Sequence, residues 1–182
     1  MNPVYGLIAL IVLGLIGLFA LPKKLGAGIL PAESLGGISP AKYPYADLFK
    51  KWASKYNVDP DIVAAHGMAE TKFDPNAINE EDPKLDYDSS YGLMQVQLAT
   101  AQDFGAVVNY RAATPAEIAW LMDISNNIKV GAWNVARWQH KYPFDVAVQM
   151  YNTGERGYNE LGRRAGVYLA RVREAYNDYH GS

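Results

Sequence analysis

The sequence has no cysteine, only three histidines and no excess of positive charge. Without cysteine the chain forms no disulfide and no thiolate metal site, and it has no thiol nucleophile. The 17 basic and 19 acidic residues give a net charge of −2, which argues against a nucleic-acid partner because phosphate binding needs a basic surface. His66, His140 and His180 match no zinc-ligand spacing, so we expect them in packing or surface roles. The sequence predicts neither a metal nor a cofactor.

The 182 residues, 49% apolar and 20% charged, suffice for one folded domain with an appendage. We expect a transmembrane anchor at 1–21, a flexible linker rich in glycine and proline at 22–41, and a single compact domain at 42–182. Residues 4–21 are uncharged and almost wholly apolar, and such a helix nearly spans a hydrocarbon layer of ~30 Å. A secretory signal peptide is the alternative, but no Lys or Arg precedes the run and no convincing cleavage site follows it.

Helix-starting signals dominate the rest of the chain. Asp59-Pro60-Asp61 predicts a helix start, and Thr114 to Glu117 forms a capping box with proline at the first helical position. Further helices are expected from Ile124 to Tyr142, from Pro143 to Tyr151 and from Arg163 to Tyr179. Strand alternation is convincing nowhere, although Asp82 to Ser90 has room for a short hairpin or loop. The sequence predicts a mainly helical domain.

Glu70 is the first candidate for a catalytic residue. Helical spacing places it with Val63 and Gly67 on a small, apolar helix face, in the last turn before Lys72. The helix dipole at that end and partial burial both raise the pKa of a carboxyl group, and a glutamic acid protonated near neutral pH is a general acid. A surface glutamate at a helix end is the alternative on these features alone.

A series of motifs follows Glu70 in a fixed order. They are Tyr91-Gly92-Leu93-Met94-Gln95, Thr100-Ala101, Asp123 with Asn127-Ile128 and Gly131, Met150-Tyr151-Asn152-Thr153-Gly154, and Tyr168-Leu169-Ala170-Arg171-Val172. This order and spacing resembles the lytic transglycosylase catalytic domain of the soluble-transglycosylase type, which is related to goose-type lysozyme. The resemblance covers roughly Tyr45 to Tyr176. It implies a lysozyme-like, mainly α (α+β) fold with a groove for peptidoglycan glycan strands.

The resemblance also implies roles for single residues. Its catalytic glutamate corresponds to Glu70, and Thr71 stands where the family usually has serine. Met94 and Gln95 would line the sugar site, and Tyr151 would contact the catalytic carboxyl group. Two further substrate-binding residues are expected from the motifs: Tyr91, and Asn152, which would meet the substrate's acetamido group or local backbone.

The family's reaction needs one carboxyl group, because the substrate's own acetamido group relieves the charge at C1 and the product is a 1,6-anhydro sugar. A hydrolytic muramidase on the same fold is the nearest alternative, and it requires a second carboxylate from Asp82, Asp86 or Asp88 at a distance of ~6.5 to 9.5 Å from the first. A solvated or ion-binding loop is the plainer interpretation of that acidic run, which lacks the pattern of a calcium loop. A non-catalytic glycan-binding assembly protein is the third interpretation.

The direction of membrane insertion conflicts with this function. Lys23 and Lys24 follow the anchor and favour a cytoplasmic domain, whereas peptidoglycan lies outside the cytoplasmic membrane. One hypothesis is a bacteriophage virion protein, presented to the wall when the particle meets the envelope. The alternative is a bacterial envelope enzyme that faces the periplasm and opens the wall for a larger machine.

Overall fold

The computed structural model describes residues 43–80 and 89–180, except the side chains of residue 156 and residues 160–165. The expected anchor at 4–21, the linker at 22–41 and the acidic residues Asp82, Asp86 and Asp88 lie outside the described residues. Within the two described ranges, no helix combines the length and the apolar character needed to cross a bilayer.

The domain opens with two helices, α1 (Ala46–Tyr56) and α2 (Pro60–Thr71). As predicted, the Asp59 side chain caps α2 by accepting a hydrogen bond from the Asp61 N–H, and Pro60 takes the first helical position. Lys72 ends α2 in a left-handed conformation with φ 57°. Glu70 therefore lies in the last turn of α2, as the sequence predicts.

The remaining helices are α3 (Leu98–Phe104), the short 3-10 helix η2 (Tyr110–Ala112), α4 (Pro115–Met122), α5 (Ile124–Gln139) and α6 (Phe144–His180). The predicted capping box between Thr114 and Glu117 is present, with hydrogen bonds in both directions. The sequence predicts two helices in the last region, and α6 does consist of two helices, which meet at a kink where Gly154 (φ 65°, ψ 174°) is not helical. Glycine adopts this conformation without steric cost, so the chain changes direction within one residue and needs no loop.

A small antiparallel sheet is present, as an α+β fold requires, although strand alternation in the sequence is convincing nowhere. It contains β1 (Ile78–Asn79), β2 (Ser90–Tyr91) and β3 (Val96–Gln97), in the order β1-β2-β3. Tyr91 pairs with Ile78 on one side and with Val96 on the other. Strands of two residues are too short to produce a detectable alternation, which is why the sequence does not reveal them.

Helix α5 forms the centre of the core. Ile128, Val130 and Val135 are buried, and a Cβ added to Gly131 would lie only 2.7 to 2.8 Å from side-chain atoms of Met94. The loop between β2 and β3 therefore rests directly on the α5 backbone. Among the tryptophans of the domain, Trp138 is buried, and Trp120 and Trp133 are half-buried.

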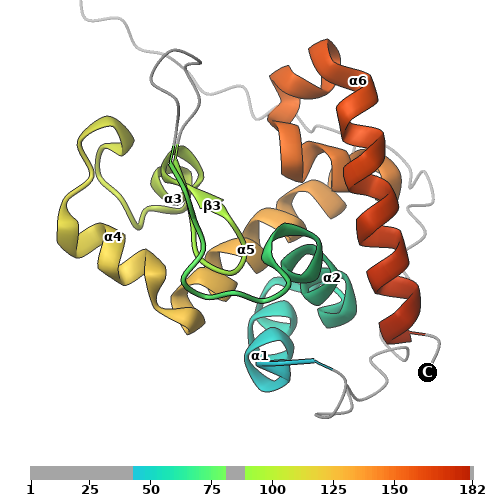
Figure 1. Cartoon of the computed structure of the whole chain (residues 1–182), viewed down its shortest axis with the longest axis horizontal. Helices are drawn as coiled ribbons and strands as arrows, with labels where there is room; N and C mark the ends of the chain where they lie inside the picture. Colours follow the sequence, from blue (N-terminus) through green and yellow to red (C-terminus); the bar gives the residue numbers. More distant parts are fainter. Residues whose placement is uncertain (1–42, 81–88, 181–182) are drawn as a thin grey trace, which may run out of the picture.

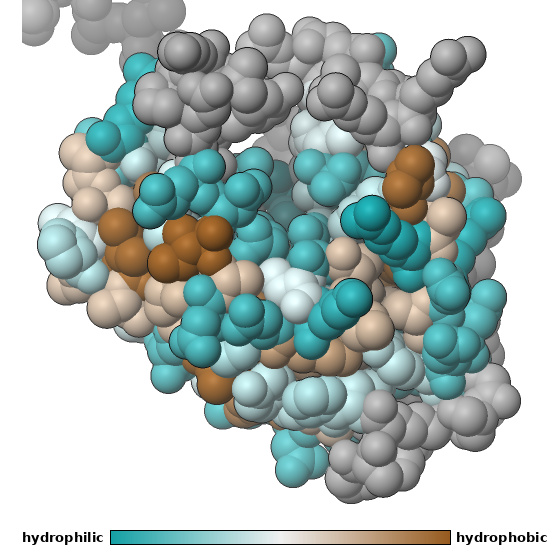
Figure 2. Space-filling view, viewed as in Figure 1, coloured by the Kyte–Doolittle hydropathy of each residue, from teal (hydrophilic) through white to brown (hydrophobic). Residues whose placement is uncertain are grey.

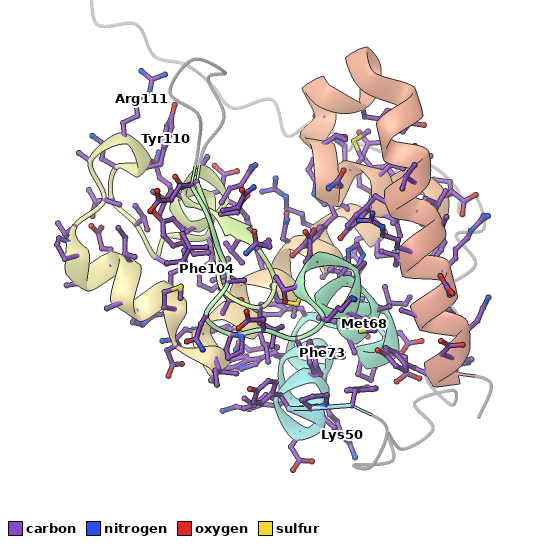
Figure 3. All side chains as sticks on the ribbon, viewed as in Figure 1. Lys50, Met68, Phe73, Phe104, Tyr110 and Arg111 are labelled. Atoms are coloured by element: carbon purple, nitrogen blue, oxygen red, sulfur yellow. The ribbon has the colours of Figure 1, made fainter. Side chains whose placement is uncertain are left out.

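The elements leave a hollow on one face. Figure 1 shows α3 and α4 on one side of the molecule and the final part of α6 on the other, with the sheet and α2 between them. In the same view, Figure 2 shows a recess near the centre of the face, surrounded mainly by hydrophilic residues. Tyr110 and Arg111 project from the tip of the α3 and α4 side, away from the body of the molecule (Figure 3).

Candidate active site

Glu70 is half-buried at the end of α2, and two residues of α6 act on its carboxyl group. Burial raises its pKa from 4.5 to about 7, partly offset by a hydrogen bond from the Tyr168 hydroxyl and by the positive charge of Arg171. The predicted direction of the pKa shift is thus present, and burial is its main cause. Near neutral pH this carboxyl group can both give and take a proton.

Tyr168 and Tyr151 stand side by side on α6 next to Glu70. Their rings are parallel within 2°, with centroids 6.5 Å apart. Burial raises the pKa of both phenols well above 10, and the charge of Glu70 adds to the effect. Both hydroxyl groups therefore keep their protons and serve as hydrogen-bond donors. The Tyr151 hydroxyl donates to the Met94 carbonyl oxygen at 2.8 Å, which ties α6 to the loop after β2.

His66 lies one turn before Glu70 on α2 and is 1% exposed. Its Nδ1 atom is 2.8 Å from the Tyr168 hydroxyl oxygen, and its ring centroid is 4.3 Å from that of Tyr151. Burial lowers the pKa of His66 to about 3. The ring is therefore neutral in the range where Glu70 titrates, and it carries one N–H group.

Thr71 fastens the loop after β2 to the end of α2. Its hydroxyl donates to the Leu93 carbonyl oxygen at 2.9 Å and accepts a hydrogen bond from the Asp74 N–H at 3.1 Å. These contacts go to backbone groups. The substrate-binding role expected for Thr71 stays a prediction, and its described role is to set the position of the loop beside Glu70.

Buried Asn127 of α5 holds the same loop from the other side. Its Oδ1 accepts from the Met94 N–H at 2.8 Å, while its Nδ2 donates to the Tyr91 and Leu121 carbonyl oxygens at 2.8 and 3.0 Å. Met94 itself is 0% exposed, packed against Gly131. Its side chain thus packs between the loop and α5. A sugar contact by Met94 stays a prediction.

Gln95, Tyr91 and Asn152 complete the predicted set. Gln95 has φ 46°, and its side-chain amide donates to the Ala77 and Gly92 carbonyl oxygens at 3.3 and 3.0 Å. Tyr91 is half-buried in β2, and Asn152 is exposed on α6 directly after Tyr151. The positive φ and the two amide bonds hold Gln95 in a tight turn, which gives the loop one fixed shape.

Sequence reasoning missed three parts of this site. It assigned His66 to a packing or surface role, and Tyr168 and Arg171 appeared only inside a motif. The signal available for His66 was its spacing of one helical turn from Glu70. Tyr168 and Arg171 share a face of α6 by the same spacing, but nothing local indicates which helix that face meets.

The titratable groups around Glu70 differ from those of a metal site. In the part of the chain that the structure describes, no group of three or more His, Cys, Asp or Glu residues could hold a metal ion. In the same ranges, no second carboxylate is among the causes of the Glu70 pKa shift. Among the described residues, the arrangement offers one carboxyl group for proton transfer, with two tyrosine hydroxyls beside it.

Comparison with known proteins gives a family match over most of the domain. The family model described as "Transglycosylase SLT domain" matches residues 47–171. A protein of Edwardsiella ictaluri (strain 93-146), named "Membrane-bound lytic murein transglycosylase C", is 29% identical over 100 residues, which cover 55% of this chain and 26% of that protein. The matched region thus spans about a quarter of the length of that relative.

Proposed function

We propose, from the chain's membership of the transglycosylase SLT domain family, that it is a peptidoglycan lytic transglycosylase with Glu70 as its acid and base. The single observation that carries the proposal is the half-buried position of the Glu70 carboxyl group beside Tyr168 in the last turn of α2, where burial raises its pKa to about 7. A group with that pKa is present in both protonation states near neutral pH. It can protonate a leaving group in one step and remove a proton in the next.

The bond to be cleaved is the β-1,4 bond between N-acetylmuramic acid and N-acetylglucosamine. Glu70 gives its proton to the glycosidic oxygen while the C1–O bond breaks, and the muramic acetamido oxygen closes on C1. The ionised Glu70 then takes the proton of the 6-hydroxyl group, whose oxygen attacks C1 and displaces the acetamido oxygen. The product is a 1,6-anhydro sugar, Glu70 regains its proton, and no water is consumed.

The surrounding residues would bind and orient the sugars. Gln95 sits in a turn fixed by two backbone bonds, and Tyr151 packs beside Glu70 with its hydroxyl bound to the same loop. Exposed Asn152 is available for the acetamido group, and half-buried Tyr91 offers an aromatic face. Thr71 and Met94 support this surface through the contacts described above.

We also propose that the domain acts from a membrane anchor at residues 4–21, through the linker at 22–41. The apolar run and the name of the Edwardsiella relative, which calls that protein membrane-bound, support this proposal. The site of action would be the cell envelope, either in a phage particle at the wall or on the periplasmic face. Protease treatment of intact spheroplasts tests the orientation. Digestion of the domain from outside would contradict the cytoplasmic location that Lys23 and Lys24 favour.

The enzymatic proposal is tested by mass spectrometry of soluble fragments from purified sacculi treated with the full-length chain. We expect 1,6-anhydro ends, which are one water lighter than hydrolysed ends. Glu70→Gln should lower the rate at least ~100-fold, since a general acid contributes that much, and it should still bind sacculi. Glu174→Gln, an exposed glutamate on α6, is the matched control and should retain full activity.

Two results would overturn the proposal. Hydrolysed ends would support the muramidase alternative, which draws a second carboxylate from Asp82, Asp86 or Asp88. Equal behaviour of the wild-type protein and Glu70→Gln, with binding but no cleavage by either, would support a non-catalytic glycan-binding protein.

A further inference from the structure

His66 and Tyr168 come from distant parts of the chain and contact each other beside Glu70. They are 102 residues apart in sequence, and a hydrogen bond of 2.8 Å joins His66 Nδ1 to the Tyr168 hydroxyl oxygen. The same hydroxyl group hydrogen-bonds the Glu70 carboxyl group. His66 is 1% exposed and Tyr168 is 6% exposed, so bulk water does not compete for these bonds.

The direction of both hydrogen bonds follows from the number of hydrogens present. An ionised Glu70 carboxylate can only accept, so the single hydrogen of the Tyr168 hydroxyl goes to Glu70. The hydroxyl oxygen must then accept from His66. Since buried His66 is neutral, with a pKa of about 3, its one ring hydrogen lies on Nδ1 when Glu70 is ionised.

We propose that His66 is a positioning residue that holds the Tyr168 hydroxyl in the orientation that donates to one oxygen of Glu70. The inference rests on the proposed function, in which Glu70 is the acid. With one carboxyl oxygen accepting from Tyr168, the acid proton is confined to the other oxygen, from which it is delivered to the glycosidic bond. The same bond stabilises the carboxylate that must form when the proton leaves.

The alternative is that His66 only fills space between α2 and α6. A filling role depends on side-chain volume, whereas a positioning role depends on the Nδ1–H donor. Among the described residues, the titratable or charged groups that act on Glu70 or lie beside it are His66 of α2 and Tyr151, Tyr168 and Arg171 of α6. Of these, only His66 bonds the hydroxyl that in turn bonds the carboxyl group.

The test compares His66→Asn with His66→Leu in the full-length chain. Asparagine and leucine are close in size, but only asparagine carries an N–H group one bond beyond Cγ, where histidine has Nδ1. We expect His66→Leu to lower the maximal cleavage rate about tenfold and to raise the Glu70 pKa by about half a unit or more, because the carboxylate loses an oriented donor. His66→Asn should keep the wild-type pKa within ~0.2 units and most of the rate.

Two readouts separate this inference from the proposed function. The alkaline limb of the pH–rate profile gives the Glu70 pKa from the activity. A carbon-13 NMR titration of the glutamate carboxyl groups gives the same pKa without requiring activity. If the wild-type protein releases no anhydro sugar, the proposed function fails while the titration still tests His66. Equal Glu70 pKa values in His66→Leu, His66→Asn and the wild-type protein would overturn the inference.

A nitrogen-15 spectrum of the wild-type imidazole tests the inference where a variant does not fold. We expect the His66 hydrogen on Nδ1, which is the less common tautomer of a free histidine. A hydrogen on Nε2 would contradict the proposed direction of the hydrogen bonds.

Discussion

At the residue scale, Asn127 is the side chain on which the geometry of the loop beside Glu70 most depends. Its amide group makes three hydrogen bonds to backbone atoms of β2, of the loop after it and of α4. A Cβ on Gly92 would lie 2.6 Å from its Nδ2 atom, and Gly92 has φ 70°. The glycine is thus required both by its backbone conformation and by the close approach of Asn127.

Replacing Asn127 by alanine should destabilise the fold by about 2 to 4 kcal/mol, because it leaves buried backbone groups without partners. Cleavage should also slow, since the loop that carries Gln95 loses its anchor. Urea unfolding measures the first effect. Asn159→Ala, an exposed asparagine on α6, is the control and should change the stability by less than ~0.5 kcal/mol. A similar loss in both variants would contradict the role given to Asn127.

At the element scale, the close approach of α5 to the loop after β2 depends on a helix position without a side chain. Gly131 lies against the Cβ, Cγ and Cε atoms of Met94. Cβ and Cγ lie close to the Met94 backbone, so a movement of the flexible end of the side chain does not make room for an added Cβ. Gly166 on α6, in contrast, is exposed, and a Cβ added there would meet no atom within 4 Å.

The same substitution at these two glycines should therefore have opposite effects. Gly131→Ala should lower the free energy of unfolding by about 1 to 3 kcal/mol through overpacking. Gly166→Ala should raise it by about 0.5 to 1 kcal/mol, because alanine favours a helix and meets no neighbour. Chemical unfolding of both variants checks the pair. Stabilisation by Gly131→Ala would mean that α5 and the loop are less tightly packed than described.

The helix-starting signals explain which elements could be predicted. The Asp59 cap and the Thr114 capping box lie where the sequence placed them, because a cap involves only residues within one turn. Two helix boundaries were not predicted: α5 ends at Gln139, three residues before the predicted Tyr142, and the second helix of α6 follows the Gly154 kink directly instead of starting at Arg163. Both depend on how the helix ends pack against other elements.

At the scale of the whole molecule, the site affects how stability depends on pH. The pKa of Glu70 is about 7 in the folded protein and 4.5 as the ordinary value, so the folded state binds the proton more tightly. The contribution of Glu70 to stability is complete below pH 4.5 and is lost as the pH rises through 7. Above that range the folded protein carries a half-buried, ionised carboxylate.

Glu70→Gln should consequently stabilise the protein at pH 8 by about 2 to 3 kcal/mol relative to the wild type, following the conversion of a pKa shift into free energy. At pH 4.5 the two proteins should differ little. Thermal or urea unfolding at the two pH values provides the measurement. His66 titrates in both proteins and cancels in the comparison. If the free energies of unfolding of Glu70→Gln and the wild type differ by the same amount at pH 4.5 and pH 8, the raised pKa of Glu70 is contradicted.

The sequence by itself determined the mainly helical class, the position of Glu70 in the last turn of its helix, and the resemblance to lytic transglycosylases, which the family match confirms. These depend on short-range signals and on the order of motifs along the chain. Only the tertiary structure decided that Tyr168 and Arg171 of α6 act on Glu70, and that His66 supports Tyr168 from across 102 residues. Contacts between distant helices depend on how their faces pack and on the water that packing excludes, and no local pattern encodes either.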